Sequence, residues 1–329
     1  MKIFMTGATG YIGSYVKAML LDKGETVHAL CRNPDDLEDH INLVKFKGDI
    51  TDSDAVAAAM LGCEQVYHLA AYAKPWAKNP DTYYQINLRA VQNILDIAHR
   101  LGIQKTLFTS TAGVLGPSVS RPVKEDDERI GEIMNEYEDS KTQAEELCLQ
   151  YVKEKNMDIV IVNPPRIYGP GVDQESNSIT RMLKLYDAGK WRVIPGDGKG
   201  IGSYVHVEDV AAGHLLAMEH GRPGQRYILS GENLSYNEFF GIMKKITGKN
   251  YRLFHAPLPI MLLGGHLMVL REKITGTPPP ITPKWIKKYS YNYALDASKA
   301  QNELGYTYRN FEEGLKQTYD RITDNEYGQ

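Results

Sequence analysis

The stretch MTGATGYIG, Met5 to Gly13, decides the fold of this chain. It follows a short apolar segment, Lys2 to Thr6, that predicts a strand, and it runs into an amphipathic segment, Tyr11 to Asp22, that predicts a helix. Three glycines lie between the two elements, spaced three residues apart: Gly7, Gly10 and Gly13. The first permits a tight turn, the second lets backbone N–H groups approach a phosphate, and the third lets the helix pack closely on the sheet. A strand, glycine turn and helix in this order favour a dinucleotide site, and a plain tight turn is the alternative.

The length and charge of the chain narrow the possible functions. Its 329 residues are enough for about two domains. With 38 basic and 41 acidic residues interspersed, the formal net charge is −3, which excludes a basic face for nucleic acid and leaves a small molecule as the expected ligand. Three distant cysteines, Cys31, Cys63 and Cys148, lack metal-ligand spacing, so we expect reduced thiols, no metal and a cytoplasmic protein. No signal peptide is expected before the first strand.

The longest apolar run, Pro257 to Leu270, is interrupted by Gly264 and Gly265. It is shorter than the roughly 20 residues that a membrane span needs, so no span is expected. The run predicts a buried or pocket-covering helix, and contact with a membrane surface is the alternative.

Strand and helix patterns alternate through Asn163, which predicts an α/β fold with a Rossmann-type, doubly wound parallel sheet. Beyond that point Pro, Gly and aromatic residues become denser, which suits a smaller α+β substrate lobe. We therefore expect a dinucleotide-binding domain over 1–163 and a mainly substrate-binding lobe over 164–329, with 204–222 returning to the first domain.

The end of the second predicted strand, Glu25 to Cys31, bears on the choice of cofactor. An acidic side chain at this place accepts hydrogen bonds from the adenosine ribose, but here the next residue is Arg32. Arginine suits a 2′-phosphate, so we expect NADP(H) in preference to NAD(H), with a solvated surface arginine as the alternative. After the third strand, Asp49 can accept from the adenine amino group while Ile50 covers the ring.

Small and hydroxyl side chains follow two more predicted strands. Gln65 to His68 continues into Leu69, Ala70 and Ala71, which leave room for a cofactor ribose at the sheet's ligand-binding edge. Lys105 to Ser110 ends in a run of hydroxyls that includes Thr109, Ser110 and Thr111. Asn87 lies on a long predicted helix from Tyr83 to Arg100, where an inward hydrogen-bonding role is plausible. His68 is given no role.

Residues Tyr137 to Val152 form a predicted helix that places Tyr137 and Lys141 on one stripe with Ala144, Cys148 and Tyr151. Glu138, Asp139, Gln143, Glu145, Glu146 and Gln150 are predicted to point away from it. A buried charged lysine is costly unless it has a use, which argues against an ordinary surface pair. Lowering a tyrosine pKa from about 10 to about 7 takes roughly 4 kcal/mol, and one ammonium at ~4 Å supplies about that. The pair can then act as a general acid/base near neutral pH.

At this point the chain resembles the extended short-chain dehydrogenases/reductases, closest to the dihydroflavonol reductase and 3β-hydroxysteroid dehydrogenase branch. TGATGYIG, GDITD, HLAA, TSTAG, the Tyr137-x-x-x-Lys141 pattern, NPPRIYGPG, YVHVEDVAAGHLLA and YILSGEN occur in that family's order over nearly the whole chain. The resemblance implies that Tyr137 transfers the proton, Lys141 lowers its pKa and holds the nicotinamide ribose, and Thr111 hydrogen-bonds the substrate oxygen, with Ser110 as the runner-up. Further expected cofactor contacts are Thr9, Tyr11, Ile12, Leu69, Ala70, Ala71, Asn87, Thr109, Pro164 and Ile167.

The resemblance leaves the reaction open between three readings. The first is NADP(H)-dependent reduction of a ketone or aldehyde, or the reverse alcohol oxidation. The second is a nucleotide-sugar 4-epimerase or dehydratase, but Gly202 and Ser203 stand where those enzymes carry an Arg-Asp pair, and Lys199 or Arg166 would have to compensate. The third is a non-catalytic NADP(H) sensor, which has no need of the Tyr-Lys-Thr set. Tyr72, Trp76, Arg166 and Tyr168 are weaker substrate candidates. The three aromatic ones, together with the Pro257 to Leu270 run expected over the nicotinamide, favour a largely apolar substrate. A homodimer is implied by resemblance only.

Overall fold

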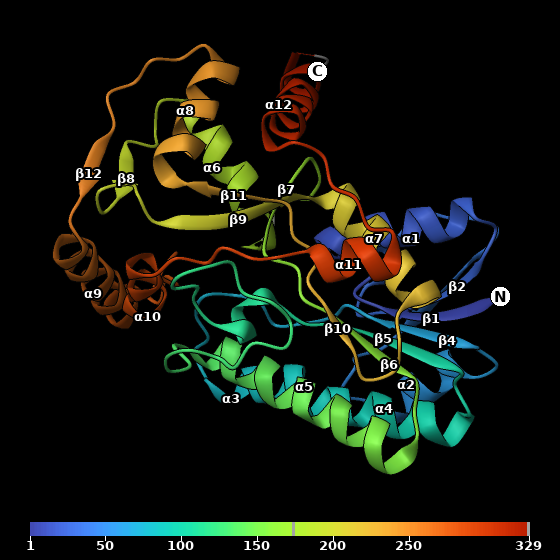
Figure 1. Ribbon diagram of the computed structural model, residues 1–329. Coiled ribbons are helices and arrows are strands. Elements are labelled where there is room, and N and C mark those ends of the chain that lie inside the picture. The colour runs from blue at the N-terminus through green and yellow to red at the C-terminus, as the bar shows by residue number, and fades with distance from the viewer. Residues whose placement is uncertain (173–174, 328–329) are drawn as a thin grey trace.

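The computed structural model describes residues 1–172 and 175–327 and shows two lobes (Figure 1). In the described part, the larger lobe is built on a seven-stranded sheet of order β10-β6-β5-β4-β1-β2-β3, with parallel pairing throughout. Its strands are β1 (Lys2–Thr6), β2 (Thr26–Cys31), β3 (Leu43–Lys47), β4 (Gln65–His68), β5 (Lys105–Thr109), β6 (Ile159–Val162) and β10 (Arg226–Tyr227). Because the strand order reverses between β1 and β4, the ligand crevice of a doubly wound sheet lies at their carboxyl ends. The predicted fold class is confirmed.

Helices cover both faces of this sheet, which is why strands such as β6 are apolar and buried along their whole length. One face carries α1 (Tyr11–Asp22), α7 (Val207–His220) and α11 (Ser298–Leu304), and the other carries α2 (Ser53–Met60), α4 (Ala90–Leu101) and α5 (Glu136–Lys155). The β1–α1 and β4–β5 connections and the start of α5 therefore meet at one edge.

The smaller lobe is α+β and has an aromatic core. Its strands and longer helices are β7 (Arg166–Tyr168), β8 (Val193–Pro195), β9 (Ile201–His206), β11 (Glu232–Ser235), β12 (Phe254–Ala256), α6 (Ser178–Asp187), α8 (Tyr236–Thr247), α9 (Leu258–Thr275), α10 (Pro283–Lys287) and α12 (Phe311–Tyr327). Strands β11, β9 and β7 form one sheet and β12 pairs with β8. Tyr204 stacks on Phe239 with ring centroids 4.9 Å apart, and Phe311 lies 4.8 Å from Tyr168.

The chain passes between the lobes more than once. Residues 207–220 form α7, which packs on α1, and β10 pairs with β6, so both belong to the larger lobe's layers. Tyr204, by contrast, lies in β9 of the smaller lobe's sheet. The predicted division at residue 163 stays a prediction.

The long helix predicted from Tyr83 to Arg100 is interrupted. The structure has α3 (Asp81–Tyr84), one π-helical turn over Gln85–Arg89 and then α4. Such turns commonly occur at functional sites, and this one contains the buried Asn87.

The prediction of a buried or pocket-covering helix from the Pro257–Leu270 run is wrong. The run forms α9, but Gly265 is the buried residue of that helix, and large apolar side chains such as Ile260 and Leu263 are more than 60% exposed. The spacing of apolar residues does not indicate which side of α9 is buried, because the helix is apolar on nearly all sides and only one side is covered.

The β1–α1 turn gives a test of the fold. A Cβ at Gly13 would lie 1.9 Å from the Gly7 carbonyl oxygen, so Gly13→Ala must push α1 off the sheet. We expect a loss of about 1–3 kcal/mol in the free energy of unfolding, measured by urea denaturation. The control is Gly241→Ala in α8, where nothing lies within 4 Å of the new Cβ and stability should stay level or rise. Equal stability of Gly13→Ala and wild type would contradict the packing described.

Candidate active site

The glycine turn is shaped by two close backbone approaches. Gly7 has a φ of +77°, and a Cβ there would lie 2.7 Å from the backbone nitrogen of Ala70, beyond the end of β4. Gly13 presses against the Gly7 carbonyl from the other side. Both positions require glycine, as the sequence predicts, and the turn leaves the crevice clear of side chains.

The amino end of α1 presents a suitable environment for an anion. Gly10 caps the helix, and the first turn contains no acidic residue. Thr9 and Ile12 are partly exposed beside it, whereas the Tyr11 side chain is buried and donates from its hydroxyl to the Gly169 carbonyl at 2.9 Å. The free N–H groups and positive dipole of a helix start bind phosphates, so these residues fit the pyrophosphate of a dinucleotide.

Arg32 stands exposed directly after β2. Within the described residues, no ion pair or hydrogen bond holds its guanidinium. The nearby acid Asp36 instead accepts from the side chain of Asn33 at 2.7 Å. An unengaged guanidinium at this strand end is available for a phosphate.

Asp49 and Ile50 follow β3 but are occupied by the fold. The Asp49 carboxylate accepts from the backbone N–H and the hydroxyl of Thr51, at 3.0 and 2.7 Å. Ile50 is 9% exposed and belongs to the core under α2 and α4. Their contacts with adenine stay a prediction.

The end of β4 opens toward the crevice. Leu69 and Ala70 are partly exposed and Ala71 is exposed. His68 before them is buried, with Nδ1 2.7 Å from the Thr6 hydroxyl, and burial followed by the charge of Lys141 lowers its pKa to about 3. A neutral histidine therefore supports the strand end.

Asn87 connects this loop to α5, the helix that carries Tyr137 and Lys141. Its carbonyl oxygen accepts from the Tyr72 N–H at 2.8 Å, and its amide donates to the Tyr72 carbonyl at 3.2 Å and to Ser140 Oγ at 3.1 Å. Ser140 in turn donates to the Tyr137 carbonyl. The predicted inward role is therefore one of positioning, and a contact of Asn87 with the cofactor stays a prediction.

Tyr137 and Thr111 lie close together although they belong to different elements of the larger lobe. Tyr137 lies in the first turn of α5, Thr111 directly follows the β5 exit, and the Thr111 hydroxyl lies close enough to the phenol to act against the rise of its pKa. Ser110, the runner-up, instead faces the buried Glu145. The structure thus brings Thr111 and not Ser110 to the tyrosine.

The Tyr137 pKa differs from the sequence-based expectation. Desolvation raises it to about 12, against the opposing effect of the nearby Thr111 hydroxyl. Lys141 does not offset this, because its Nζ donates to the Thr109 carbonyl at 2.8 Å and lies 4.0 Å from the Phe108 ring centroid. The phenol therefore keeps its proton at neutral pH.

Lys141 is 1% exposed and has no carboxylate partner among the described residues. Burial lowers its pKa to about 8. Thr109, which holds the ammonium through its carbonyl, is itself fixed by a 3.0 Å contact between its hydroxyl and His214 Nε2 on α7. The sequence correctly places this lysine on the buried stripe of α5.

Two acids predicted to point away from that stripe are buried. Glu138 is 1% exposed and pairs with Arg129 and with Lys288. Glu145 is fully buried, accepts from Asn163 and pairs with Arg226 at 2.8 Å. The positions 138, 141 and 145 follow a helical spacing, so a wider buried arc was readable, but their cationic partners come from distant segments.

Trp285 of α10 covers the candidate proton donor, a contact that no local sequence pattern predicts. Its ring stacks on Tyr137 with centroids 6.2 Å apart at 27°. The Lys288 ammonium lies 5.0 Å from the Trp285 ring centroid while it pairs with Glu138. Trp285 thus takes the place over the site that was predicted for Pro257 to Leu270, which packs behind α10.

Pro164 and Ile167 sit near the strand ends. The Pro164 carbonyl accepts from the Ala112 N–H at 2.9 Å, which fixes the residue after Thr111. Ile167 is buried in β7. The backbone around Thr111 is thus held from β6 as well as β5.

The four weaker substrate candidates do not gather in one place. Tyr72 and Trp76 lie together in the loop after β4, where the Tyr72 hydroxyl donates to the Trp76 carbonyl at 3.0 Å. Arg166 lies over the rings of Tyr204 and Tyr236, at 5.6 and 5.7 Å. Tyr168 is only 1% exposed and packs in the aromatic core, so the structure does not bring it to the site.

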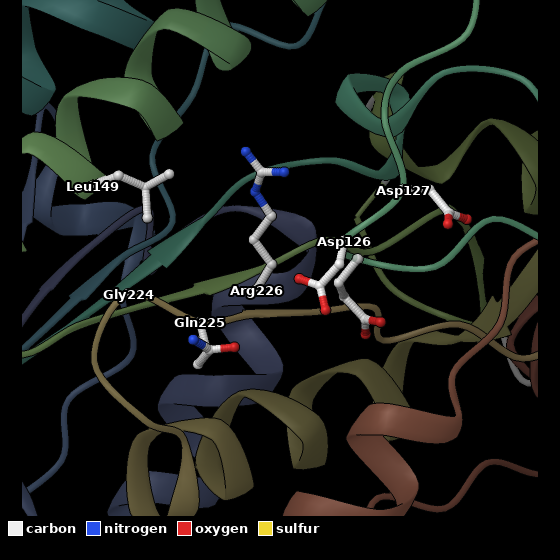
Figure 2. Close-up of a pocket in the computed structure, with 7 residues that line it drawn as sticks. Asp126, Asp127, Leu149, Gly224, Gln225 and Arg226 are labelled. Carbon is white, nitrogen blue, oxygen red and sulfur yellow. The ribbon is translucent and has the colours of Figure 1, made fainter.

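A separate hollow of about 260 Å³ opens at the β10 edge of the sheet (Figure 2). Its lining consists of Glu125, Asp126, Asp127, Leu149, Gly224, Gln225 and Arg226. The Arg226 guanidinium is already paired with Glu145. Among the described residues, no group of three metal-ligating side chains gathers, and no helix has the length and apolar character to cross a membrane.

Known proteins resemble this chain over most of its length. The family model described as NAD dependent epimerase/dehydratase family matches residues 3–230. A putative dihydroflavonol 4-reductase of Synechocystis sp. is 31% identical, over 95% of this chain and 92% of the relative. Cinnamoyl-CoA reductase 2 of Medicago truncatula is 30% identical, over 74% of this chain and 76% of the relative.

Two solved structures share the fold. The crystal structure of gox2253 has a TM-score of 0.82 at 26% identity and covers 98% of both chains. UDP-glucose 4-epimerase from Thermotoga maritima has a TM-score of 0.81 at 24% identity, over 99% of this chain and 100% of that one. Together with the glycine turn and the family match, these likenesses show that the chain belongs to the NAD dependent epimerase/dehydratase family and is an NAD(P)-dependent oxidoreductase of the extended short-chain dehydrogenase/reductase type.

Proposed function

We propose that the chain reduces a ketone or aldehyde with NADPH, using Tyr137 as proton donor, Thr111 as its hydrogen-bonding partner and Lys141 as a buried cation at the cofactor. The observation that carries the proposal is Tyr137 at the start of α5, stacked beneath Trp285 and next to the Thr111 hydroxyl, with a buried ammonium one helical turn further along α5. A non-catalytic sensor of the cofactor has no use for this set.

The residues present suit a dinucleotide. The glycine turn folds tightly on its own backbone and carries no side chain at Gly7, Gly10 or Gly13, and the α1 start offers donors without an acid. A bound nicotinamide supplies the hydride for the carbonyl carbon. The protein's part is to orient the carbonyl oxygen between the Thr111 and Tyr137 hydroxyls and to donate the phenol proton to it as the C–O single bond forms.

The raised Tyr137 pKa favours the direction of reduction. With a pKa of about 12, the phenol keeps its proton at neutral pH and can donate it. Alcohol oxidation needs the phenolate, which the desolvated site disfavours unless the Lys141 charge is brought closer.

The Trp285 ring over Tyr137 favours a substrate with an apolar, ring-bearing body. Trp285 stacks on Tyr137, while Tyr72 and Trp76 are partly exposed in the loop that Asn87 holds. Two relatives are named for dihydroflavonol and for cinnamoyl-CoA. Aromatic walls of this kind take up planar apolar groups.

One observation favours the sugar-nucleotide reading as a second candidate. A Cβ at Gly202 would lie 1.7 Å from Arg166 Nη1, so the guanidinium occupies the space beside that glycine. The same Nη1 is buried without a hydrogen-bond partner among the described atoms. A cation so placed can bind a diphosphate in place of the missing arginine at Gly202.

Replacing Tyr137 tests the acid role. Tyr137→Phe should lower kcat for NADPH-dependent reduction about 10²–10⁴-fold, since it removes the donated proton while the ring and its stacking on Trp285 remain. The assay is the consumption of NADPH with a panel of aromatic and aliphatic carbonyl compounds. Tyr151→Phe is the matched control, because it lies on the same helix and loses one hydrogen bond to Asp96. Wild-type kcat in Tyr137→Phe would refute the role.

Replacing Arg32 tests the cofactor preference. Arg32→Ala should weaken the binding of NADPH about 10–100-fold and leave the binding of NADH unchanged, as measured by calorimetry, because only the 2′-phosphate meets the guanidinium. Arg100→Ala, an exposed arginine at the far end of α4, is the control. An unchanged ratio of the two dissociation constants in Arg32→Ala would contradict the preference.

Replacing Lys141 tests whether its charge is held at a cost. Its folded pKa of about 8 lies below the ordinary 10.5, so the unfolded chain binds the proton more strongly between these values. The buried Lys141 ammonium therefore lowers the free energy of unfolding by its full amount below pH 8, and this loss disappears as the pH rises to 10.5. Between pH 8 and 10.5 the free energy of unfolding of wild type should therefore rise by about 3 kcal/mol relative to that of Lys141→Met, as measured by urea denaturation. Parallel pH profiles for the two proteins would show that the ammonium is not desolvated.

A further inference from the structure

Helix α9 carries an uncovered apolar stripe. Ile260, Leu263, Leu267, Leu270 and Ile274 are 63, 61, 57, 53 and 78% exposed. Their spacing of three, four, three and four residues places them along one side of the helix. Contiguous exposed apolar side chains of this kind mark a contact surface.

The opposite side of α9 is already used. A Cβ at Gly265 would lie 2.6 Å from the Ile286 side chain and 3.4 Å from Pro283, so α9 and α10 are in tight contact there. Figure 1 shows both helices at the border of the smaller lobe, next to β12 and β8. Phe254 of β12 is 54% exposed and adds a ring near the start of the stripe.

The segment that carries the stripe is strongly basic. Residues 249–288 contain seven Lys and Arg against the single acid Glu272, a formal charge of +6 in a chain whose total is −3. The rest of the chain therefore carries −9. The exposed members are Lys249, Arg252, Arg271, Lys273, Lys284 and Lys287, and of these Lys284 is paired with Glu136. The seventh cation, Lys288, is partly buried and paired with Glu138.

We propose that this face, α9 with Phe254 and the surrounding cations, binds the surface of an anionic lipid membrane. The apolar stripe would enter the boundary between headgroups and acyl chains, and the cations would meet the lipid phosphates and carboxylates. The helix lies on the surface and does not cross, because it lacks the length and apolar character of a span.

The charge argues for this occupant over a second copy of the chain. Two of the seven cations pair with acids outside the segment, Lys284 with Glu136 and Lys288 with Glu138, which leaves a charge of +4 (6 − 2). A symmetric contact through α9 would bring two such basic segments together, whereas a membrane of negative surface potential attracts each of them. Attraction of this kind weakens with salt, which gives a second readout.

The test is flotation of the full-length protein with lipid vesicles. One set is phosphatidylcholine alone and the other contains about one third phosphatidylserine. Wild type should float with the anionic vesicles, about tenfold less with the neutral ones, and less as salt rises. Leu263→Ser/Leu267→Ser should bind the anionic vesicles at least about tenfold more weakly, because it loses apolar contacts. Arg271→Glu/Lys273→Glu should show a similar loss, because its charge is reversed.

The control is Leu61→Ser, a 65% exposed leucine at the end of α2, which should bind like wild type. All substituted side chains are exposed, so thermal unfolding should match wild type in each variant. Wild type that stays free of anionic vesicles would overturn the proposal, as would equal losses in the control. Sedimentation velocity showing a dimer that only Leu263→Ser/Leu267→Ser disrupts, without vesicle binding, would assign the stripe to a second copy instead.

Discussion

The arrangement of the site depends on the ion pairs of one buried carboxylate, that of Glu138. It lies next to Tyr137 in α5 and pairs with Arg129 from the loop after β5 and with Lys288 from the smaller lobe. A buried acid without a cationic partner costs several kcal/mol, so the fold keeps cations at this carboxylate. Lys288 in turn lies against Trp285, which stacks on Tyr137. One desolvated charge therefore fixes the distance between the lobes at the point where the chemistry is proposed.

How much the sequence could reveal depended on whether a feature is local. The glycine turn, the parallel strands and the burial of Lys141 follow from backbone sterics and helical spacing within short segments, and the structure has them. The stack of Trp285 on Tyr137 joins residues 148 positions apart, and no local pattern reports such a contact. The prediction for α9 was wrong for another reason: an apolar run has the same sequence pattern whether its outer side is covered or exposed.

The same fold leaves the reaction to a few side chains. Family membership supplies the sheet, the glycine turn and the dinucleotide chemistry, but reductases and sugar-nucleotide enzymes share all three. In this chain the decision rests on Arg32 at one end of the crevice and on Trp285 and Arg166 at the other. An aromatic cover over Tyr137 suits an apolar carbonyl compound, while the unpaired guanidinium nitrogen of Arg166 would suit a diphosphate.

Identification of the nucleotide that the purified protein retains tests the central claim most directly. A reductase exchanges its cofactor in every turnover, whereas an epimerase returns the hydride to the same substrate and can keep NAD bound. Protein denatured after gel filtration should release no nucleotide, or NADP(H) in less than stoichiometric amount, as measured by mass spectrometry of the supernatant. Release of stoichiometric NAD would contradict the reductase account and move the assignment to the sugar-nucleotide enzymes.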